Sequence, residues 1–238
     1  SGKKVSAFIA QTLPNAGLLA LSSIVIAMLL GGLLGIISVL SKDRWLDKAI
    51  QLISTLGMSV PSFFSAILFA WVFGFVLHRY TGLQMTGSLY EVDDFGNGTY
   101  IQWKNLILPA IVLGIRPLAV VSQLMRNSLL EVLNQDYITT AKAKGLSQRA
   151  VIGRHALKNS LNPVVTAISG WFASMLAGAV FVEFIFGWNG IGKEIVDALN
   201  KSDLPVIMGT VIVIASLFIV INIFVDILYG WLDPKIRV

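Results

Sequence analysis

The sequence has 238 residues, of which 55% are hydrophobic and only 13% are charged. This balance excludes an ordinary soluble domain, in which about 25% of residues are charged, and indicates a membrane protein. The net charge of +5 needs no nucleic-acid partner, because cationic loops are typical of the cytoplasmic side of membrane proteins.

Five stretches are long and apolar enough to cross a bilayer, for which a helix needs about 20 residues. In chain order, these predicted spans are 13–40, 49–77, 105–130, 161–186 and 204–229. They are apolar on all sides, whereas barrel strands would alternate every second residue. The predicted fold class is therefore all-α, a polytopic transmembrane helical bundle.

The segment before the first span, residues 1–12, has a different pattern. Val5, Phe8, Ile9 and Leu13 have helical spacing, which predicts a short amphipathic helix on the outer surface. We expect residues 13–238 to form one transmembrane domain.

The distribution of Lys and Arg predicts the orientation, because cytoplasmic loops retain these residues. They are concentrated in 41–48, in 126–160 and in the C-terminal tail, so these regions are predicted to be cytoplasmic. Loops 78–104 and 187–204 balance their cations with Asp and Glu and are predicted to face outward. This orientation places residue 1 outside and predicts a leading span that the sequence lacks.

Glycine and proline mark special positions in the first two spans. Gly31, Gly32 and Gly35 favour close helix contact. Pro61 predicts a bend in the second span, and it is a candidate for a residue that faces a cavity or pathway between the spans.

Arg116 lies about 11 residues into the third predicted span, beside Pro117. A charge at this depth is costly and suggests a function. Two interpretations are open: Arg116 lines a pathway between the spans and attracts a carboxylate there, or it pairs with a partner subunit or a lipid headgroup.

Residues 131–160 form a long polar and basic loop between the third and fourth spans. Good helix formers extend to Lys144, Gly145 is a stop signal, and Ser147 is a candidate N-cap of a second helix. The loop is therefore predicted to be a helix-turn-helix on the cytoplasmic face. Basic charge alone is explained by topology, but such a helix is also well placed to dock on a soluble partner.

The string DYITTAKAKGL (136–146), followed by RHALKNSLNPVVT, resembles the loop motif of the permeases of ABC importers, most closely the dipeptide and oligopeptide branch. The family's core is Glu-Ala-Ala, three residues, then Gly. Ala141 and Gly145 match it, whereas Thr139 and Thr140 replace its first two letters. Further similar stretches are ILPAIVLG, MRNSLLEVL, FIFGWNGIG and VDILYGWLDPKIR.

The resemblance implies the type I importer transmembrane fold with six spans, in a bacterial inner membrane with a cytoplasmic C-terminus. It implies a second, related permease subunit, two cytoplasmic ATPases and an extracytoplasmic binding protein, and no catalytic residue, metal or cofactor in this chain. The residues expected to couple to the ATPases are Asp136, Tyr137, Thr140, Ala141, Lys142, Ala143, Lys144, Gly145 and Leu146.

The outward loop begins with GWNGIGKE (187–194), which comes close to the spacing of a phosphate-binding loop. Glu194 stands where Ser or Thr belongs, and no strand is predicted before it, so we predict a tight turn and an amphipathic segment instead. Glu183, Trp188 and, deeper in its span, Trp171 are candidates for pathway or gate residues. Packing is the alternative role for each of them.

Other classes of function fit less well. Two separated histidines and the absence of cysteine do not provide a usual metal site or a protease dyad. A secondary transporter driven by an ion gradient would need a relay of charges in the spans, and a purely structural membrane protein would show no transport. Within the importer family, nickel complexes remain an alternative substrate.

Overall fold

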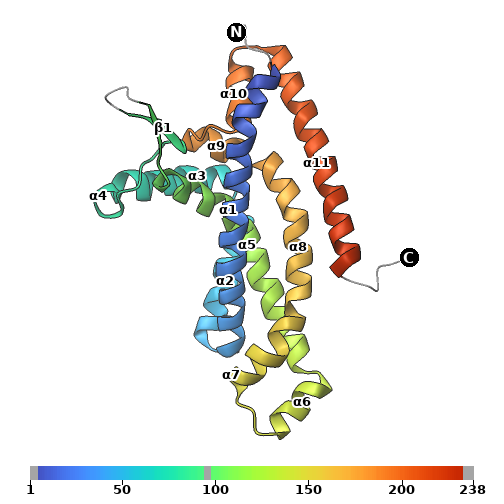
Figure 1. The fold of residues 1–238 in the computed structure, drawn as a ribbon. Helices are drawn as coiled ribbons and strands as arrows, with labels where there is room; N and C mark the ends of the chain where they lie inside the picture. The colour runs from blue at the N-terminus through green and yellow to red at the C-terminus, as the bar shows by residue number, and fades with distance from the viewer. Residues whose placement is uncertain (1–4, 94–97, 233–238) are drawn as a thin grey trace. The chain divides into compact units, whose positions relative to one another are not determined.

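The computed structural model describes residues 5–93 and 98–232, and these residues are mainly helical (Figure 1). The chain divides into two compact units that interleave along the sequence. Unit 1 contains the residues up to Ser23, Val60–Gly114 and the residues from Phe172 onward, and unit 2 contains Ile24–Ser59 and Ile115–Trp171.

Unit 1 is built from short elements, one complete long helix and parts of three further long helices that continue into unit 2. The short elements are α3 (Ser62–Phe69), the π-helix η1 (Ala70–Val76), α4 (His78–Thr81), β1 (Tyr90–Val92), β2 (Thr99–Ile101), α9 (Val180–Phe186) and α10 (Ile191–Asn200). The strands form an antiparallel hairpin in which Tyr90 pairs with Ile101. The long helix α11 (Leu204–Leu232) follows α10 and contacts it.

Unit 2 contains the helices that carry the polar loop. Its elements are the second part of α1 (Val5–Leu40), α2 (Trp45–Ser59), most of α5 (Lys104–Leu133), α6 (Asp136–Ala143), α7 (Gln148–Val151), the π-helix η2 (Ile152–Ala156) and the first part of α8 (Leu157–Gly178). In Figure 1, α6 and α7 lie together beyond the C-terminal end of α5.

Close glycine contacts between α1 and α5 form the core of unit 2. A Cβ on Gly31 would lie 2.6 Å from the Leu118 carbonyl oxygen, and one on Gly35 would lie 2.6 Å from Met125 Cβ. Neither distance is sterically possible, so both positions need glycine for the helices to approach. The predicted close contact is confirmed for these two residues, whereas a Cβ on Gly32 would make only ordinary contact at 3.8 Å.

The described helices confirm the polytopic helical bundle but not all five predicted spans. Ala10–Leu40, Lys104–Leu133 and Leu204–Phe224 are each long and apolar enough to cross a membrane. The second predicted span is broken into α2 and the pair α3 and η1, which together would make a fourth. The predicted span 161–186 is divided at Ala179 into α8 and α9.

Two local features differ in detail from the sequence pattern. The predicted bend at Pro61 is a full helix break, because this residue has extended backbone (φ −61°, ψ 139°) before α3. Of the predicted outer-surface segment 1–12, residues 1–4 lie outside the described residues. No helix end separates 5–12 from the first span, since α1 runs without interruption from Val5 to Leu40.

Candidate functional site

The helix α6 is the central part of the polar loop. Helix α5 ends at Leu133, and Gln135 has extended backbone (ψ 151°) before α6 begins at Asp136. Ile138 and Ala141 are three residues apart and are buried against the chain, whereas Thr140 is exposed. The helix therefore has one buried face that attaches it to unit 2 and one free face.

The turn after α6 has the predicted geometry. Gly145 has a φ of +81°, a left-handed conformation that glycine adopts without steric cost. Ser147 Oγ accepts a hydrogen bond of 3.4 Å from the Ala150 backbone N–H, which caps the start of α7. The helix-turn-helix expected from the sequence is confirmed.

The free face of α6 offers groups suited to binding another protein. The side chains of Tyr137, Lys142, Ala143 and Lys144 are exposed. The two ammonium groups can bind carboxylates or carbonyl oxygens, and Ala143 allows close approach. Leu146 is half-buried at the end of the turn.

A hydrogen bond that the sequence did not indicate joins α6 to α8. The Asn159 side-chain amide donates to the Tyr137 hydroxyl at 2.8 Å. Tyr137 is one of the residues expected to couple to an ATPase, and within its own chain it holds α6 to α8.

In unit 1, Glu183 and Trp188 lie together at the turn between α9 and α10. Glu183 is 1% exposed, and its Oε2 accepts hydrogen bonds from the backbone N–H groups of Gly192 at 2.6 Å and Lys193 at 3.3 Å. The other oxygen, Oε1, has no hydrogen-bond partner among the described residues. A Cβ on Gly190 would lie 2.4 Å from the Glu183 carboxyl group, so this turn is closely packed around the carboxylate.

The same turn is attached to α1. Trp188 is fully buried, and its indole N–H donates to the Asn15 carbonyl oxygen at 3.1 Å. The Asn15 side-chain amide donates to the Asn189 carbonyl oxygen at 3.0 Å. We call residues 187–192, with the Glu183 carboxylate and Asn15, the outer turn.

This geometry explains why the GWNGIGKE string does not form a phosphate loop. A helix, α9, precedes it where a phosphate loop would follow a strand. The first amides of α10, which a phosphate would need, already bind Glu183. In α10 itself, Lys193 and Asp197 form an ion pair of 2.7 Å, and burial raises the pKa of Glu194, although Lys193 partly opposes this shift.

The other candidate pathway residues do not belong to the outer turn. Arg116 lies on α5 in unit 2 with an exposed side chain, and it makes no hydrogen bond or ion pair with the residues that the structure describes. Trp171, also in unit 2, is half-buried, and Pro61 is exposed in unit 1. Pro117 does not interrupt α5.

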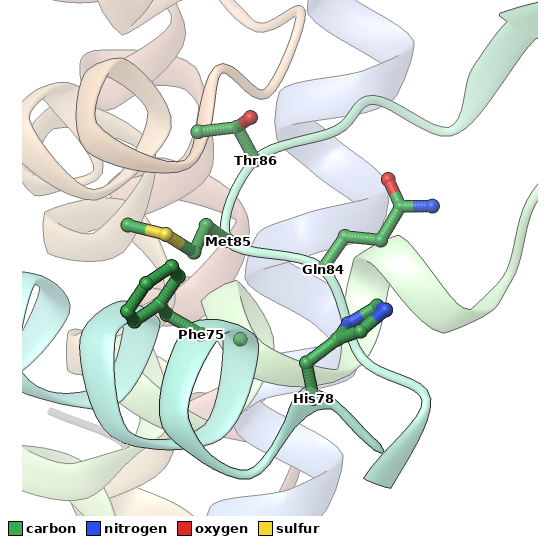
Figure 2. A pocket seen from close by; sticks show the side chains of 6 residues that line it. Phe75, His78, Gln84, Met85 and Thr86 are labelled. Carbon is green, nitrogen blue, oxygen red and sulfur yellow. The ribbon is translucent and has the colours of Figure 1, made fainter.

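A pocket in unit 1 was not foreseen from the sequence. It has a volume of about 410 Å³ and is lined by Gly74, Phe75, His78, Gln84, Met85 and Thr86. Figure 2 shows Met85 and Phe75 on one side of the pocket and Gln84 and His78 on the other. His78 Nδ1 lies 2.5 Å from the Leu83 carbonyl oxygen, so Nδ1 carries the proton and donates. The pocket is open and has both apolar and polar walls.

Sequence reasoning also missed an ion pair in unit 2. The Arg126 guanidinium binds both carboxylate oxygens of Asp47, with Nε to Oδ1 and Nη2 to Oδ2 each at 2.9 Å. The residues are 79 positions apart. Both lie in regions predicted to be cytoplasmic, and Arg126 also lies in the MRNSLLEVL stretch, but neither pattern indicated that they pair. Pairing at this separation has no local sequence signal.

Comparison with known proteins agrees with this architecture. The family described as "Binding-protein-dependent transport system inner membrane component" matches residues 27–238. The dipeptide transport system permease protein DppB of Haemophilus influenzae is 42% identical over 88% of this chain and 67% of its own length. DppB of Alkalihalophilus pseudofirmus is 38% identical over 92% of this chain and 70% of its own length.

Solved structures show the same fold at low sequence identity. An inward-facing structure of the MetNI methionine ABC transporter has a TM-score of 0.74 at 12% identity and covers 98% of this chain and 100% of the matched one. An amino acid ABC transporter has a TM-score of 0.67 at 13% identity, with coverage of 97% and 95%. The helical arrangement is thus that of the membrane subunits of such transporters.

Proposed function

The chain belongs to the family of binding-protein-dependent transport system inner membrane components, and we propose that it is a permease subunit of an ATP-driven importer of dipeptides or oligopeptides. The observation that carries the substrate class is the 42% identity to a dipeptide permease over 88% of the chain. As a family member with several apolar helices, the chain is a multi-pass protein of the inner membrane.

In the proposed assembly, this subunit forms half of the pathway and carries out no covalent chemistry. A second, related permease subunit supplies the other half, two cytoplasmic ATPases hydrolyse ATP, and an extracytoplasmic binding protein delivers the peptide. Residues 13–238 form the transmembrane domain, 131–160 form the cytoplasmic coupling loop, and the C-terminus is cytoplasmic.

The free face of α6 supports the proposed coupling. Asp136 and the exposed side chains of α6 dock on an ATPase, while Ile138 and Ala141 hold the helix to unit 2. Closure of the ATPases on ATP pushes α6, and the continuous helix α5 carries the displacement into the membrane. The spans then reorient around a central cavity, which gives alternating access.

The candidate pathway residues have different roles in this scheme. Arg116 is exposed in the isolated chain, which supports a pathway role in which it attracts the carboxylate of a peptide. Trp171 of unit 2 and Pro61 of unit 1 are each proposed as a pathway residue in its own unit. Glu183 and Trp188 are buried, which supports a role in holding the outer turn as part of a gate.

The test is a pull-down of the full-length parent protein in mild detergent, with and without Gly145→Trp. This change places a bulky side chain at a φ of +81° on the loop. The matched control is Gly98→Trp, which also lies at positive φ (+145°) with open space around it, but in the predicted outward loop.

We expect an ATPase to co-purify with the wild type and with Gly98→Trp but not with Gly145→Trp. No ATPase with any of the three proteins, together with uptake driven by an ion gradient without ATP, would contradict the importer and support a secondary transporter.

A further inference from the structure

The Asp47 carboxylate is the centre of a hydrogen-bonded cluster in unit 2. In addition to the two bonds from Arg126, it accepts bonds from the Gln51 side-chain amide at 3.0 Å and from the Asp43 backbone N–H at 3.2 Å. The Ser38 hydroxyl also donates to it. Asp47 is 1% exposed, so the carboxylate exchanges its water contacts for these five bonds.

These donors come from four different segments of the chain. Ser38 lies in the last turn of α1, Asp43 in the connection after it, and Gln51 on α2 beside Asp47 itself. Arg126 lies near the end of α5, about ten residues before α6 begins. The cluster therefore fixes the end of α1, the start of α2 and the end of α5 to one another.

The packing around this cluster leaves α1 and α5 little freedom to slide past each other. Gly35 of α1 meets Met125, the neighbour of Arg126, so closely that a Cβ would clash at 2.6 Å. Met125 and Leu129 of α5 are buried. A movement of the α5 end must therefore either carry α1 and α2 with it or break the ion pair.

A buried ion pair is a poor choice for stability alone, because apolar residues of similar size are often as stabilising once desolvation is counted. The paired N–H groups of Arg fix a carboxylate in both distance and angle. The arrangement is thus better suited to fixing geometry than to adding stability.

We infer that Asp47 and Arg126 are positioning residues of the transport cycle, whose ion pair makes the ends of α1 and α5 and the start of α2 move with α6 as one rigid body. This role rests on the proposed function, since α6 transmits force only if an ATPase docks on it. Without the ion pair, the C-terminal end of α5 moves independently of α1 and α2. Less peptide is then imported for each ATP hydrolysed.

The first experiment uses the complete transporter, assembled with the full-length parent protein and reconstituted in vesicles. Peptide imported per ATP hydrolysed is measured for the wild type, Arg126→Lys and Arg126→Met. This ratio is insensitive to a general loss of assembled complex, which lowers both quantities together. The control is Thr55→Val, which removes an exposed α2–α5 hydrogen bond of 3.5 Å from Gln123, about one turn away from Arg126.

We expect the ratio to fall roughly fivefold or more in Arg126→Met, at the lower end of typical coupling between sites. Arg126→Lys, which keeps the charge but not the paired donors, should lie between it and the wild type, and Thr55→Val should match the wild type. An assembled Arg126→Met complex with the wild-type ratio would overturn the inference.

If Arg126→Met does not assemble, the double variant Asp47→Leu/Arg126→Met carries the test, because it leaves no buried charge unpaired. It should assemble and still show the lowered ratio, and a wild-type ratio would again overturn the inference. Absence of ATP-driven import in the wild type would instead contradict the proposed function, so the two failures are distinguishable.

A second experiment measures the rigid movement itself. The 238 residues contain no cysteine, so spin labels can be placed at Arg44→Cys and Glu131→Cys, both exposed and flanking the cluster in unit 2. We expect the distance between the labels to be the same without nucleotide and in the ATP-trapped state, and to change between the states in Arg126→Met. A distance that already changes in the wild type would contradict the rigid body.

Discussion

Two buried carboxylates, Asp47 in unit 2 and Glu183 in unit 1, hold distant parts of the chain in different ways. Both are 1% exposed. Asp47 has a cation that binds both of its oxygens, whereas Glu183 binds only backbone N–H groups and leaves Oε1 without a partner among the described residues.

This difference indicates how each region responds to movement. Loss of any one neutral donor at Asp47 leaves the ion pair with Arg126 in place, so the cluster resists rearrangement. Opening of the outer turn removes both donors of Glu183 together, since they are adjacent amides at the start of α10. In the proposed function, the Asp47 cluster is therefore suited to transmitting force, and the outer turn is suited to changing shape.

The largest expected effect on stability comes from breaking the Asp47 cluster. Asp47→Ala should lower the free energy of unfolding by about 3–5 kcal/mol, because it leaves a partly buried guanidinium unpaired. Thermal unfolding of the purified protein in detergent measures this change. Asp47→Leu/Arg126→Met, which removes both charges, should cost clearly less; equal costs would show that packing, not pairing, dominates at this site.

Substitution of Glu183 in the outer turn should lower the stability less than substitution of Asp47, and the loss should depend on whether an acceptor oxygen is kept. Glu183→Ala leaves the buried Gly192 N–H and the partly buried Lys193 N–H without this acceptor and should cost about 1–3 kcal/mol. Glu183→Gln keeps a carbonyl oxygen as the acceptor, so we expect it to retain most of the stability in the same assay. A Gln variant as unstable as the Ala variant would mean that the negative charge itself is needed, and the contrast with Asp47 would disappear.

Trp188→Phe tests the attachment of the outer turn to α1. It removes the hydrogen bond to Asn15 while keeping most of the apolar volume, so a loss of about 1 kcal/mol is expected. Proteolysis or hydrogen exchange of 187–192 should report the local opening. Unchanged protection of this segment would show that the hydrogen bond from Trp188 to Asn15 does not restrain it.

Tyr137→Phe should have the smallest effect on stability. The hydrogen bond from Asn159 is exposed to water, so its loss should cost about 0.5 kcal/mol or less. Asn159→Ala is the matched variant from the other side of the same bond. A loss above about 1 kcal/mol in either variant would show that this bond, like the Asp47 cluster, holds α6 in place.

Local sequence signals predicted much of the fold. Three of the predicted apolar spans are uninterrupted helices, and the helix break at Pro61 lies where a bend was predicted. Gly145 and Ser147 correctly predicted the turn after α6. Each of these features depends on residues that are close in sequence, where propensity and capping act directly.

The remaining features depend on contacts between distant residues. The division at Ala179 lies inside an apolar run in which composition favours a continuous helix. Arg126 could have paired with any acidic residue on its side of the membrane, and only the approach of α1 and α5 through Gly31 and Gly35 selects Asp47. The sequence marked Glu183 as a charge within an apolar span, but it did not show which groups bind the carboxylate.

The most direct test of the central claim is peptide uptake into vesicles that contain the full-length parent protein with its co-purifying subunits. The account predicts that dipeptide accumulates only when ATP and the external binding protein are both present, and that Gly145→Trp abolishes accumulation. Accumulation that follows an ion gradient without ATP, and that Gly145→Trp leaves unchanged, would contradict it.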